Sequence, residues 1–426
     1  MNKTNKHDVD YTSGPVGASG RKSTLSMFMV MLGFTFFSAS MWVGQNLAAG
    51  LNFWDFVWAL LLGGLILAAY TGSLGWIGAE SGLSLDLLAR RSFGKYGSYL
   101  PSAMISFTQI GWFGVGLAMF AIPVAMEIFG LEVTPDHMPA LGYVLVAVAG
   151  VLMTASAYFG IKSLTIVSYI AVPAVAILGT VAMIMAICRG DVGLVEQFSI
   201  GAKDLGVIAG AGLVIGSFVS GGTATPNFTR FAPSAKIGLI VTVIAFFIGN
   251  SLMFFFGAVS SIYAGGNDIF EVMLNLNLFY AAVIVLGLNI WTTNDNALYS
   301  AGLGLSNITG LSKKIMVIIS GLLGTVAAVW LYWNFCGWLN VLNCTLPPVG
   351  IILILHYFSN RKAYLDGTVE EPLVNWGSVL GVVAGAVVAN LVKWGIPAIN
   401  GMAVAAVCYW IGSLLKKKLS VWPPVG

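Results

Sequence analysis

Residues 287–297 read Gly287-Leu-Asn-Ile-Trp-Thr-Thr-Asn-Asp-Asn-Ala297, and they lie inside an apolar segment long enough to cross a bilayer. Six of these eleven side chains are amides, hydroxyls or a carboxyl. Polar groups are costly in hydrocarbon unless they find partners, so clusters of this density usually face a bundle interior or a water-filled pathway. The stretch therefore predicts a site for a solute or an ion at membrane depth.

The composition agrees with a membrane location. The 426 residues are 58% hydrophobic and only 9% charged, whereas soluble domains carry roughly 25% charged residues. Long apolar runs recur from residue 25 to residue 415, which predicts an all-α polytopic membrane protein and leaves no room for a soluble domain. The four cysteines show no CxxC spacing, the three histidines are scattered, and no enzyme motif is present. We therefore expect neither an enzyme nor a metal centre built from these residues.

A span needs about 20 residues, and this length predicts twelve transmembrane helices. They cover residues 25–49, 54–78, 99–129, 139–159, 163–187, 205–230, 236–263, 276–303, 313–333, 336–358, 373–392 and 396–415. Twelve spans place both terminal tails, 1–24 and 416–426, on one side. Of the 20 Lys and Arg residues, all but Arg189, Lys203 and Lys393 fall on that side, so the positive-inside rule makes it cytoplasmic.

Two of these spans contain residues that interrupt a helix. The first includes Gly33-Phe-Thr-Phe-Phe-Ser-Ala-Ser40, and the sixth includes Gly216-Ser-Phe-Val-Ser-Gly-Gly-Thr-Ala-Thr-Pro226. Interruptions five helices apart indicate two inverted repeats with a binding site near the membrane midplane. Close helix packing through Gly and Ser is the alternative explanation, and it weighs more for the first span than for the sixth.

The eighth span presents oxygen atoms on one side. Four polar residues share a helical face: Asn289, Thr292, Thr293 and Asn296. Adjacent threonine hydroxyls, with a backbone carbonyl one turn earlier, can present hard oxygens to a small cation. Carbonyls of Gly33 and Phe36 in the opposing interrupted span would complete the set. Hydrogen bonding between helices explains the same side chains equally well.

A second group of residues suits a flat polar ring. Gln109 and Trp112 lie three residues apart in the third span, so they share a face. The indole can stack on a ring while the amide reads its edge. Phe218 in the sixth span is a candidate for the other aromatic wall, with Ser217 and Ser220 beside it. Single aromatic residues in a span are usually packing residues, so this interpretation depends on their joint placement.

Three further features keep alternatives open. Asp295 fits a proton relay, a structural hydrogen bond or an ion pair. The connection 79–98 is amphipathic and is expected at the cytoplasmic interface. The connection 264–275 fits either a short extracellular helix or a plain loop.

Several of these stretches carry a resemblance that covers residues 13–415, apart from the loop 188–204. The strongest are 28–42 (Phe-Met-Val-Met-Leu-Gly-Phe-Thr-Phe-Phe-Ser-Ala-Ser-Met-Trp), 108–116 (Thr-Gln-Ile-Gly-Trp-Phe-Gly-Val-Gly), 216–220 and 286–299, with support from 88–94 and 347–350. Together they resemble the nucleobase:cation symporter-1 family.

The resemblance implies a LeuT-like fold, in which spans 1 and 6 are broken. Its two inverted five-helix repeats would cover 25–187 and 205–358, and two peripheral helices would cover 373–415. It also implies symport of a nucleobase with a cation. The implied aromatic walls are Trp112 and Phe218.

The resemblance also assigns the polar groups. Those that read the ring edge would be Gln109, Ser217, Ser220, Asn289 and Asn294. The sodium ligands would be the carbonyls of Gly33, Phe36 and Asn289 and the hydroxyls of Thr292 and Thr293. Asn294 lies off the helical stripe, so only the resemblance directs it toward the ring. Phe218 stands where relatives that carry hydantoins have tryptophan, which fits a smaller pyrimidine.

We therefore expect a sodium-coupled importer of cytosine in a bacterial inner membrane, acting as a monomer without nucleic-acid partners. Sodium would be a coupling ion and not a prosthetic group. Proton coupling through Asp295, transport of uracil or hydantoin, a nucleobase receptor that transports nothing, and a channel remain alternatives.

Overall fold

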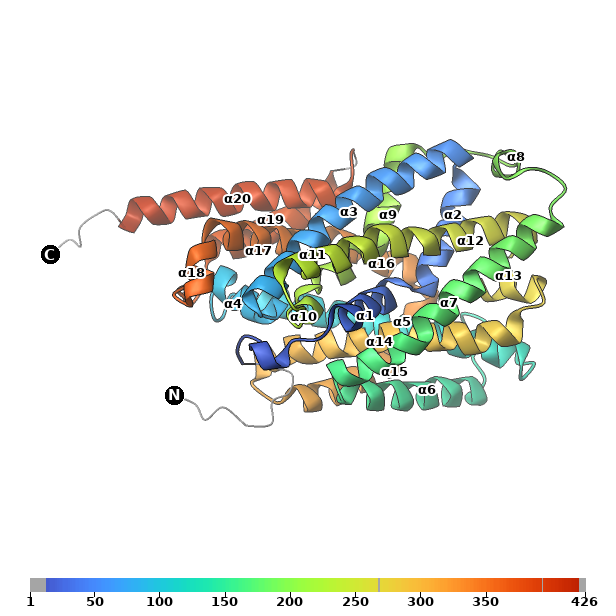
Figure 1. The fold of residues 1–426 in the computed structure, drawn as a ribbon, viewed down its shortest axis with the longest axis horizontal. Coiled ribbons are helices and arrows are strands. Elements are labelled where there is room, and N and C mark those ends of the chain that lie inside the picture. Colours follow the sequence, from blue (N-terminus) through green and yellow to red (C-terminus); the bar gives the residue numbers. More distant parts are fainter. Residues whose placement is uncertain (1–12, 267–268, 393, 421–426) are drawn as a thin grey trace.

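The computed structural model describes residues 13–266, 269–392 and 394–420. Within these ranges the regular structure is helical, with one isolated bridge between Thr134 and His137. The predicted tails 1–24 and 416–426 lie partly outside the described residues. Helix α1 begins and α20 ends at the same end of the bundle, which we call the terminal end; the opposite end is the loop end (Figure 1).

Each of the twelve predicted spans corresponds to one helix or to consecutive helices in the described part of the chain. In chain order they are α1 (Thr24–Thr35) with α2 (Ser38–Gly50), α3 (Phe53–Ser81), α5 (Tyr99–Glu127), α6 (Ala140–Tyr158), α7 (Ile161–Arg189), α9 (Val207–Thr223) with α10 (Pro226–Thr229), α11 (Ala235–Val243) with the π-helical turn η2 (Ile244–Gly249) and α12 (Asn250–Ala264), α14 (Phe279–Thr309), α15 (Lys313–Trp333), α16 (Phe335–Thr345) with α17 (Pro347–Ser359), α19 (Trp376–Leu391) and α20 (Pro397–Ser420). The remaining short helices are η1 (Ala18–Gly20), α4 (Leu85–Phe93), α8 (Leu194–Phe198), α13 (Ile269–Asn275) and α18 (Arg361–Asp366).

Length and apolar composition alone qualify seven spans of the described chain for crossing a membrane, and the bent pair α1–α2 adds an eighth. Helices α9, α17 and α19 are apolar but shorter. Helix α14 is long, with 31 residues, and contains the polar stretch. A polar helix of this length is stable in a membrane only where its neighbours cover it, and α14 is buried along most of its polar residues.

The first span breaks where the sequence predicts. Helix α1 ends at Thr35, α2 begins at Ser38, and their axes differ by 51°. Phe36 and Phe37 between them are non-helical, with ψ angles of 93° and 132°. The last carbonyls of α1 and the first N–H groups of α2 therefore need partners from outside their own helices.

The sixth span breaks later than its glycine content indicates. Gly216 to Thr223 remain helical in α9, and the interruption falls at Ala224 and Thr225. The glycines are held by close neighbours, since a side chain at Gly222 would collide with Thr71 of α3. Pro226 then takes the first position of α10, where its missing N–H costs nothing.

The tenth span, predicted as one helix over 336–358, is two. Helices α16 and α17 meet at Leu346, directly before Pro347 and Pro348. Two consecutive prolines provide no N–H groups for the preceding turn, which explains the division.

Both of these connections contain a helix. Of the two alternatives left open for 264–275, the structure shows the short helix, α13. The connection 79–98 contains α4, whose last turn carries Arg90 and Arg91. Most of α4 is buried against other helices, so it is part of the bundle and not only an interfacial element.

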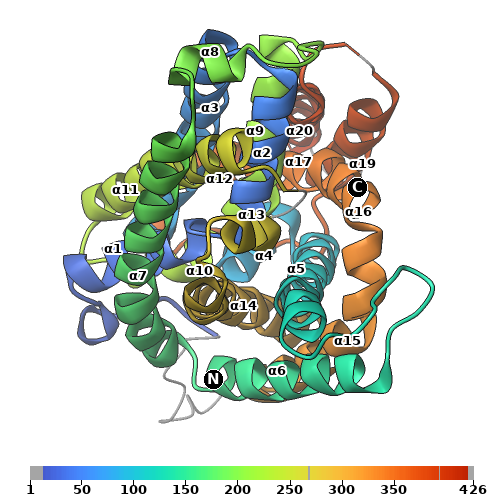
Figure 2. The ribbon, with the colours of Figure 1, turned by 90° about the vertical axis from the view of Figure 1, so that its right-hand side faces the viewer.

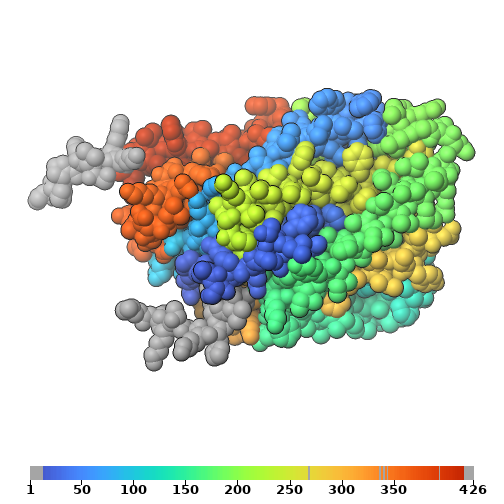
Figure 3. Space-filling model, in the orientation of Figure 1, coloured from blue at the N-terminus to red at the C-terminus, as the bar shows by residue number. Residues whose placement is uncertain are grey.

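Helices α14 and α5 form the most extensive pair of the bundle, and α7, α6 and α15 also pack on α14 (Figure 2). Helices α19 and α20 pack mainly on each other and contact the rest chiefly through α17 and α16, with smaller contacts to α4 and α9. Helix α20 runs along one edge of the molecule (Figure 3), as expected of a peripheral element. The boundaries proposed for the repeats and for this pair remain predictions.

Candidate functional site

The break in the first span is completed by side chains of α14. The hydroxyl of Thr292 donates to the carbonyl of Gly33 at 3.0 Å. The amide of Asn289 donates to the carbonyl of Phe36 and accepts from the N–H of Ser38 at 2.9 Å. Three backbone groups that the break leaves without helical partners are thus satisfied from one face of α14.

The same face collects oxygen atoms. The Thr292 hydroxyl lies 2.7 Å and the Thr293 hydroxyl 3.2 Å from the carbonyl oxygen of Asn289. The carbonyl of Gly33 meets this set through the Thr292 hydroxyl, whereas the carbonyl of Phe36 accepts from the side-chain nitrogen of Asn289. The five groups that were predicted to hold sodium therefore lie at the break of the first span and on the face of α14 that meets it. These oxygens fit a hard cation, and the absence of a carboxylate from the set fits a monovalent one. In the described residues no three His, Cys, Asp or Glu side chains gather as a metal site.

Gly33 has a second reason to lack a side chain. A Cβ atom at this position would collide with the hydroxyl of Ser168 on α7. Glycine therefore lets α1 approach α7 closely at the point where its carbonyl faces Thr292.

The predicted ring-binding residues come from α5 and α9. The indole N–H of Trp112 donates to the hydroxyl of Ser220 at 3.3 Å, which ties the third span to the sixth. The ring of Phe37, in the break of the first span, meets Trp112 edge-on with centroids 5.6 Å apart. Sequence reasoning missed Phe37, although it lies inside the stretch 28–42 and directly follows a predicted ligand.

Phe218 belongs to an aromatic group around Phe34, which precedes the break of the first span. Its ring packs edge-on against Phe34 at 5.3 Å and Phe246 at 5.5 Å. Ser217 is turned into its own helix, where it donates to the carbonyl of Val214 at 2.8 Å. The two predicted aromatic walls are therefore on helices that touch.

Gln109 and Asn294 retain unused hydrogen-bonding capacity. The amide nitrogen of Gln109 and the amide oxygen of Asn294 are buried and have no hydrogen-bond partner among the described residues. Asn294 donates to the carbonyl of Phe113 at 3.2 Å, and a side chain at Gly116 would collide with it. Because Gly116 shares a face of α5 with Gln109 and Trp112, Asn294 lies near the predicted ring site despite being off the stripe of α14.

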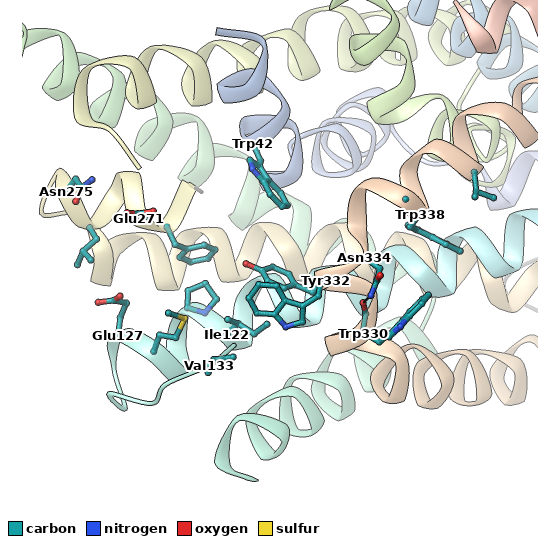
Figure 4. Close-up of a pocket in the computed structure, with 17 residues that line it drawn as sticks. Trp42, Ile122, Glu127, Val133, Glu271, Asn275, Trp330, Tyr332, Asn334 and Trp338 are labelled. Carbon is teal, nitrogen blue, oxygen red and sulfur yellow. Dashed lines mark hydrogen bonds between the residues drawn. The ribbon is translucent and has the colours of Figure 1, made fainter. Parts of the chain in front are cut away.

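These residues are closed from solvent in this structure. The seven predicted ring-binding side chains are buried, with Ser217 the most exposed at 9%. A cavity of about 1090 Å³ lies instead among residues near the ends of α5 and α15 and of the short helix α13 (Figure 4). None of the predicted site residues lines it. Its walls are Trp42, Ile122, Pro123, Met126, Glu127, Val133, Phe270, Glu271, Leu274, Asn275, Trp330, Tyr332, Trp333, Asn334, Gly337, Trp338 and Val341.

This outer cavity leads toward the predicted site. Trp338 lies in its wall, and the same ring packs on Gly111, the residue before Trp112. Glu127 and Glu271 add two carboxylates to a lining of aromatic and aliphatic residues, so the cavity favours cations and flat neutral rings. Sequence reasoning did not identify this aromatic cavity, since its residues come from α2, α5, α13, α15 and α16.

Asp295 faces away from the oxygen set. It is fully buried, and the Ser156 hydroxyl of α6 lies 2.5 Å from one of its carboxyl oxygens. The indole of Trp291 donates to the same hydroxyl at 2.7 Å. One carboxyl oxygen of Asp295 thus makes a structural hydrogen bond, and the other is buried with no hydrogen-bond partner among the described residues.

Comparison with known proteins agrees with this arrangement. Residues 15–412 match the family described as "Permease for cytosine/purines, uracil, thiamine, allantoin". The cytosine permease of Escherichia coli (strain K12) is 47% identical over 406 residues, which are 95% of this chain and 94% of that protein.

Two solved structures share the fold. Mhp1, a nucleobase-cation-symport-1 family transporter in a closed conformation with bromovinylhydantoin bound, has a TM-score of 0.79 at 18% identity and covers 96% of each chain. A Na+-coupled sialic acid symporter in a substrate-bound outward-open state has a TM-score of 0.69 at 14% identity, over 96% of this chain and 92% of that one.

The predicted LeuT-like fold is confirmed by these structures, and the expectation of a transporter rather than an enzyme is confirmed by the relatives. Both the family match and the cytosine permease extend over nearly the whole chain. The chain therefore belongs to the family of permeases for cytosine/purines, uracil, thiamine and allantoin.

Proposed function

We propose that this protein imports cytosine together with sodium by alternating access across a bacterial inner membrane. The observation that carries the proposal is the convergence of five neutral oxygens on the break of the first span. Thr292 and Asn289 of α14 already hold the carbonyls of Gly33 and Phe36. Family membership and the cytosine permease relative support a nucleobase as the substrate.

In this proposal Gly33, Phe36, Asn289, Thr292 and Thr293 hold sodium, whose charge would strengthen the link between α1 and α14. The ring of cytosine lies between Trp112 and Phe218. The amides of Gln109 and Asn294, which have unused capacity, read its edge. Ser217, Ser220 and Asn289 supply further polar groups at the same level.

Coupling follows from shared structural elements. Phe36 and Ser38 are bonded to Asn289, and Phe37 between them contacts Trp112. Ordering the break around the ion therefore also orders one wall of the ring site. By linkage, each ligand must raise the affinity of the other by the same factor. Entry of one positive charge gains roughly 2.3 kcal/mol per 100 mV of membrane potential.

The orientation belongs to the same proposal. Basic residues gather at the terminal end, which we assign to the cytoplasm by the positive-inside rule. The outer cavity then faces the periplasm, and its two carboxylates attract the cation before it enters. The protein is proposed to act as a monomer.

Equilibrium binding of radiolabelled cytosine to the purified protein, in sodium against potassium at fixed pH, tests the proposal. Tighter binding in sodium supports it. Binding that ignores sodium but follows pH would replace the ion with a proton, and absence of binding would require another ring, with uracil and hydantoin the first to test. Gradient-driven accumulation in proteoliposomes would then separate a transporter from a receptor or a channel.

A further inference from the structure

The corner between α6 and α7 meets the start of α15 at the terminal end of the bundle. Helix α6 ends at Tyr158, α7 begins at Ile161, and α15 begins at Lys313. Helix α6 packs against both of the other helices, and Figures 1 and 2 show α6 and α15 along one edge of the molecule. Segments from two distant parts of the chain therefore meet here on the outside of the bundle.

Both helix starts at this corner carry an exposed lysine. Lys162 lies in the first turn of α7 and Lys314 in the first turn of α15. Neither first turn contains an acidic residue. The start of a helix is the positive end of its dipole, so a lysine placed there is repelled and not stabilised by its own helix. The corner therefore concentrates positive charge.

The chain provides no nearby carboxylate for these lysines. The sequence contains no Asp or Glu in 137–190, which includes α6 and α7, or in 296–365, which includes α15. Among the described residues no ion pair includes either lysine, whereas Arg361 at the same end of the molecule pairs with Glu80. An anion that compensates the corner is therefore expected from outside the chain.

Two aromatic rings lie between the lysines. The Lys314 ammonium lies 4.9 Å from the centre of the Tyr158 ring, and that ring packs edge-on against Phe159 at 5.7 Å. Phe159 is 70% exposed, and Lys162 follows it by three residues. Exposed aromatic rings near the end of a span are typical of the boundary between lipid headgroups and acyl chains. The two ammonium groups are thus at the level of the headgroups.

Apolar side chains continue from the lysines toward the middle of the membrane. Ile166 and Ile170 of α7 are 57% and 59% exposed, and Ile315 and Ile318 of α15 are 47% and 52% exposed. A positively charged corner above an apolar surface matches a molecule with a phosphate at one end and acyl chains at the other. A soluble anion would contact the lysines but not the isoleucines.

We propose that the corner formed by Tyr158, Phe159, Lys162 and Lys314 binds the headgroup of an anionic phospholipid, whose acyl chains lie along α7 and α15. The phosphate joins lysines from two helices and so links the α6–α7 connection to α15. The positive-inside rule explains why basic residues gather at this end. A bound lipid explains in addition why two of them lie at helix starts, beside exposed rings and without acids.

Unfolding in the presence of defined lipids tests the proposal. The purified protein in a neutral detergent receives phosphatidylglycerol, phosphatidylcholine or glycerol 3-phosphate. We expect phosphatidylglycerol to raise the unfolding midpoint by about 3 °C or more, and the other two compounds to change it little. The variant Lys162→Gln with Lys314→Gln should lose at least about half of that rise.

The matched control is Lys236→Gln with Lys362→Gln, which removes two exposed lysines from α11 and α18. It should keep the full rise, and it should retain more phosphatidylglycerol in native mass spectrometry than Lys162→Gln with Lys314→Gln. An equal rise in the two double variants would overturn the site. An equal rise with glycerol 3-phosphate would overturn the assignment to a lipid.

The same series without lipid separates lipid binding from a structural role of the lysines. The midpoint of Lys162→Gln with Lys314→Gln should then equal or exceed that of wild type, because repulsion at two helix starts is removed. A lower midpoint without lipid would show that the lysines stabilise the protein by themselves, contrary to the proposal. These measurements use neither cytosine nor sodium, so the proposed function is tested separately.

Discussion

The hydroxyl of Thr292 lies 3.0 Å from the carbonyl oxygen of Gly33, although 259 residues separate them in the chain. This contact joins α14, the long helix that carries the polar stretch, to the break in the first span. It explains how a membrane protein can retain an unwound segment, since the groups released by the break are satisfied by one neighbouring helix.

Thr293→Ala should weaken the response to sodium. The substitution removes one neutral oxygen from the proposed ion site, a loss of about 1.4 kcal/mol, so the sodium concentration for half-maximal cytosine binding should rise about tenfold. Affinity at saturating sodium should change little. Titration of binding against sodium measures both, with Thr180→Ala, an exposed threonine of α7, as control. An unchanged sodium curve would remove Thr293 from the ion site.

Asn289→Ala should destabilise the folded protein as well as weaken sodium binding. It leaves the carbonyl of Phe36 and the N–H of Ser38 unsatisfied and buried, at about 1–3 kcal/mol for each group. We expect the unfolding midpoint in detergent to fall by several degrees. Asn390→Ala is the control, because Asn390 is exposed and bonds only within α19. Equal midpoints for the two variants would contradict the bridging role.

Two substitutions of Trp112 should have graded effects on nucleobase binding. Trp112→Phe keeps an aromatic wall but loses the bond to Ser220, so affinity for cytosine should fall about fivefold. Trp112→Ala removes the wall and should cost about a hundredfold, comparable to Phe218→Ala. Competition binding measures the series, with Trp54→Ala, a substitution of an exposed tryptophan of α3, as control. If the phenylalanine and alanine variants bind equally, stacking on Trp112 is not a source of affinity.

Asp295→Asn should leave sodium dependence intact. Asparagine has nearly the shape of the carboxyl group and can still bond the hydroxyl of Ser156. Sodium stimulation of uptake should therefore remain within about twofold of wild type. Uptake by the same proteoliposomes under a pH gradient alone, without sodium, tests the alternative that protons are the coupling ion. Loss of a proton-driven component in the variant would indicate that Asp295 carries the coupling ion.

Asp86→Asn should remove a pH dependence of stability. Burial raises the pKa of the Asp86 carboxyl to about 6, and the Ser102 hydroxyl and Arg230 oppose that shift only in part. The folded state holds this proton more tightly than the unfolded state. The contribution of the Asp86 carboxyl to the free energy of unfolding is therefore most favourable below pH 4, and it is lost as the pH rises to about 6. The free energy of unfolding lost in this way is about 3 kcal/mol.

Unfolding midpoints of wild type and Asp86→Asn, measured between pH 4 and pH 8, test this sign. The difference between the two proteins should grow in favour of the variant as the pH rises and become constant above about pH 7. Asp366→Asn, at an exposed position, should show no such trend. A constant difference across the whole range would show that Asp86 does not titrate in this window.

The twelve spans and the break at Phe36 and Phe37 were predictable because each depends on local composition. Apolar length determines what can cross a bilayer, and non-helical backbone at that depth is tolerated only where neighbours satisfy it. The five groups proposed for the ion could also be named from the sequence, since they belong to a helical stripe and a broken segment; that they bind sodium stays a prediction. The interruption of the sixth span lies inside the predicted stretch 216–226, but after its glycines, because packing against other helices holds the glycines of α9 helical. The division of the tenth span at Leu346 was not predicted, although Pro347 and Pro348 are a signal for it in the sequence.

The sequence by itself determined the membrane class, the number of spans, the family resemblance and the residue types available at midmembrane depth. Tertiary structure decided which of those groups meet: that Asn289 spans the break, that Trp112 bonds Ser220, that Asp295 turns to Ser156, and that the ring residues are closed from the outer cavity. Composition and periodicity describe one helix at a time, whereas these contacts depend on how helices distant in the chain pack together. Because these polar groups are buried away from water, each contact affects the stability of the folded protein.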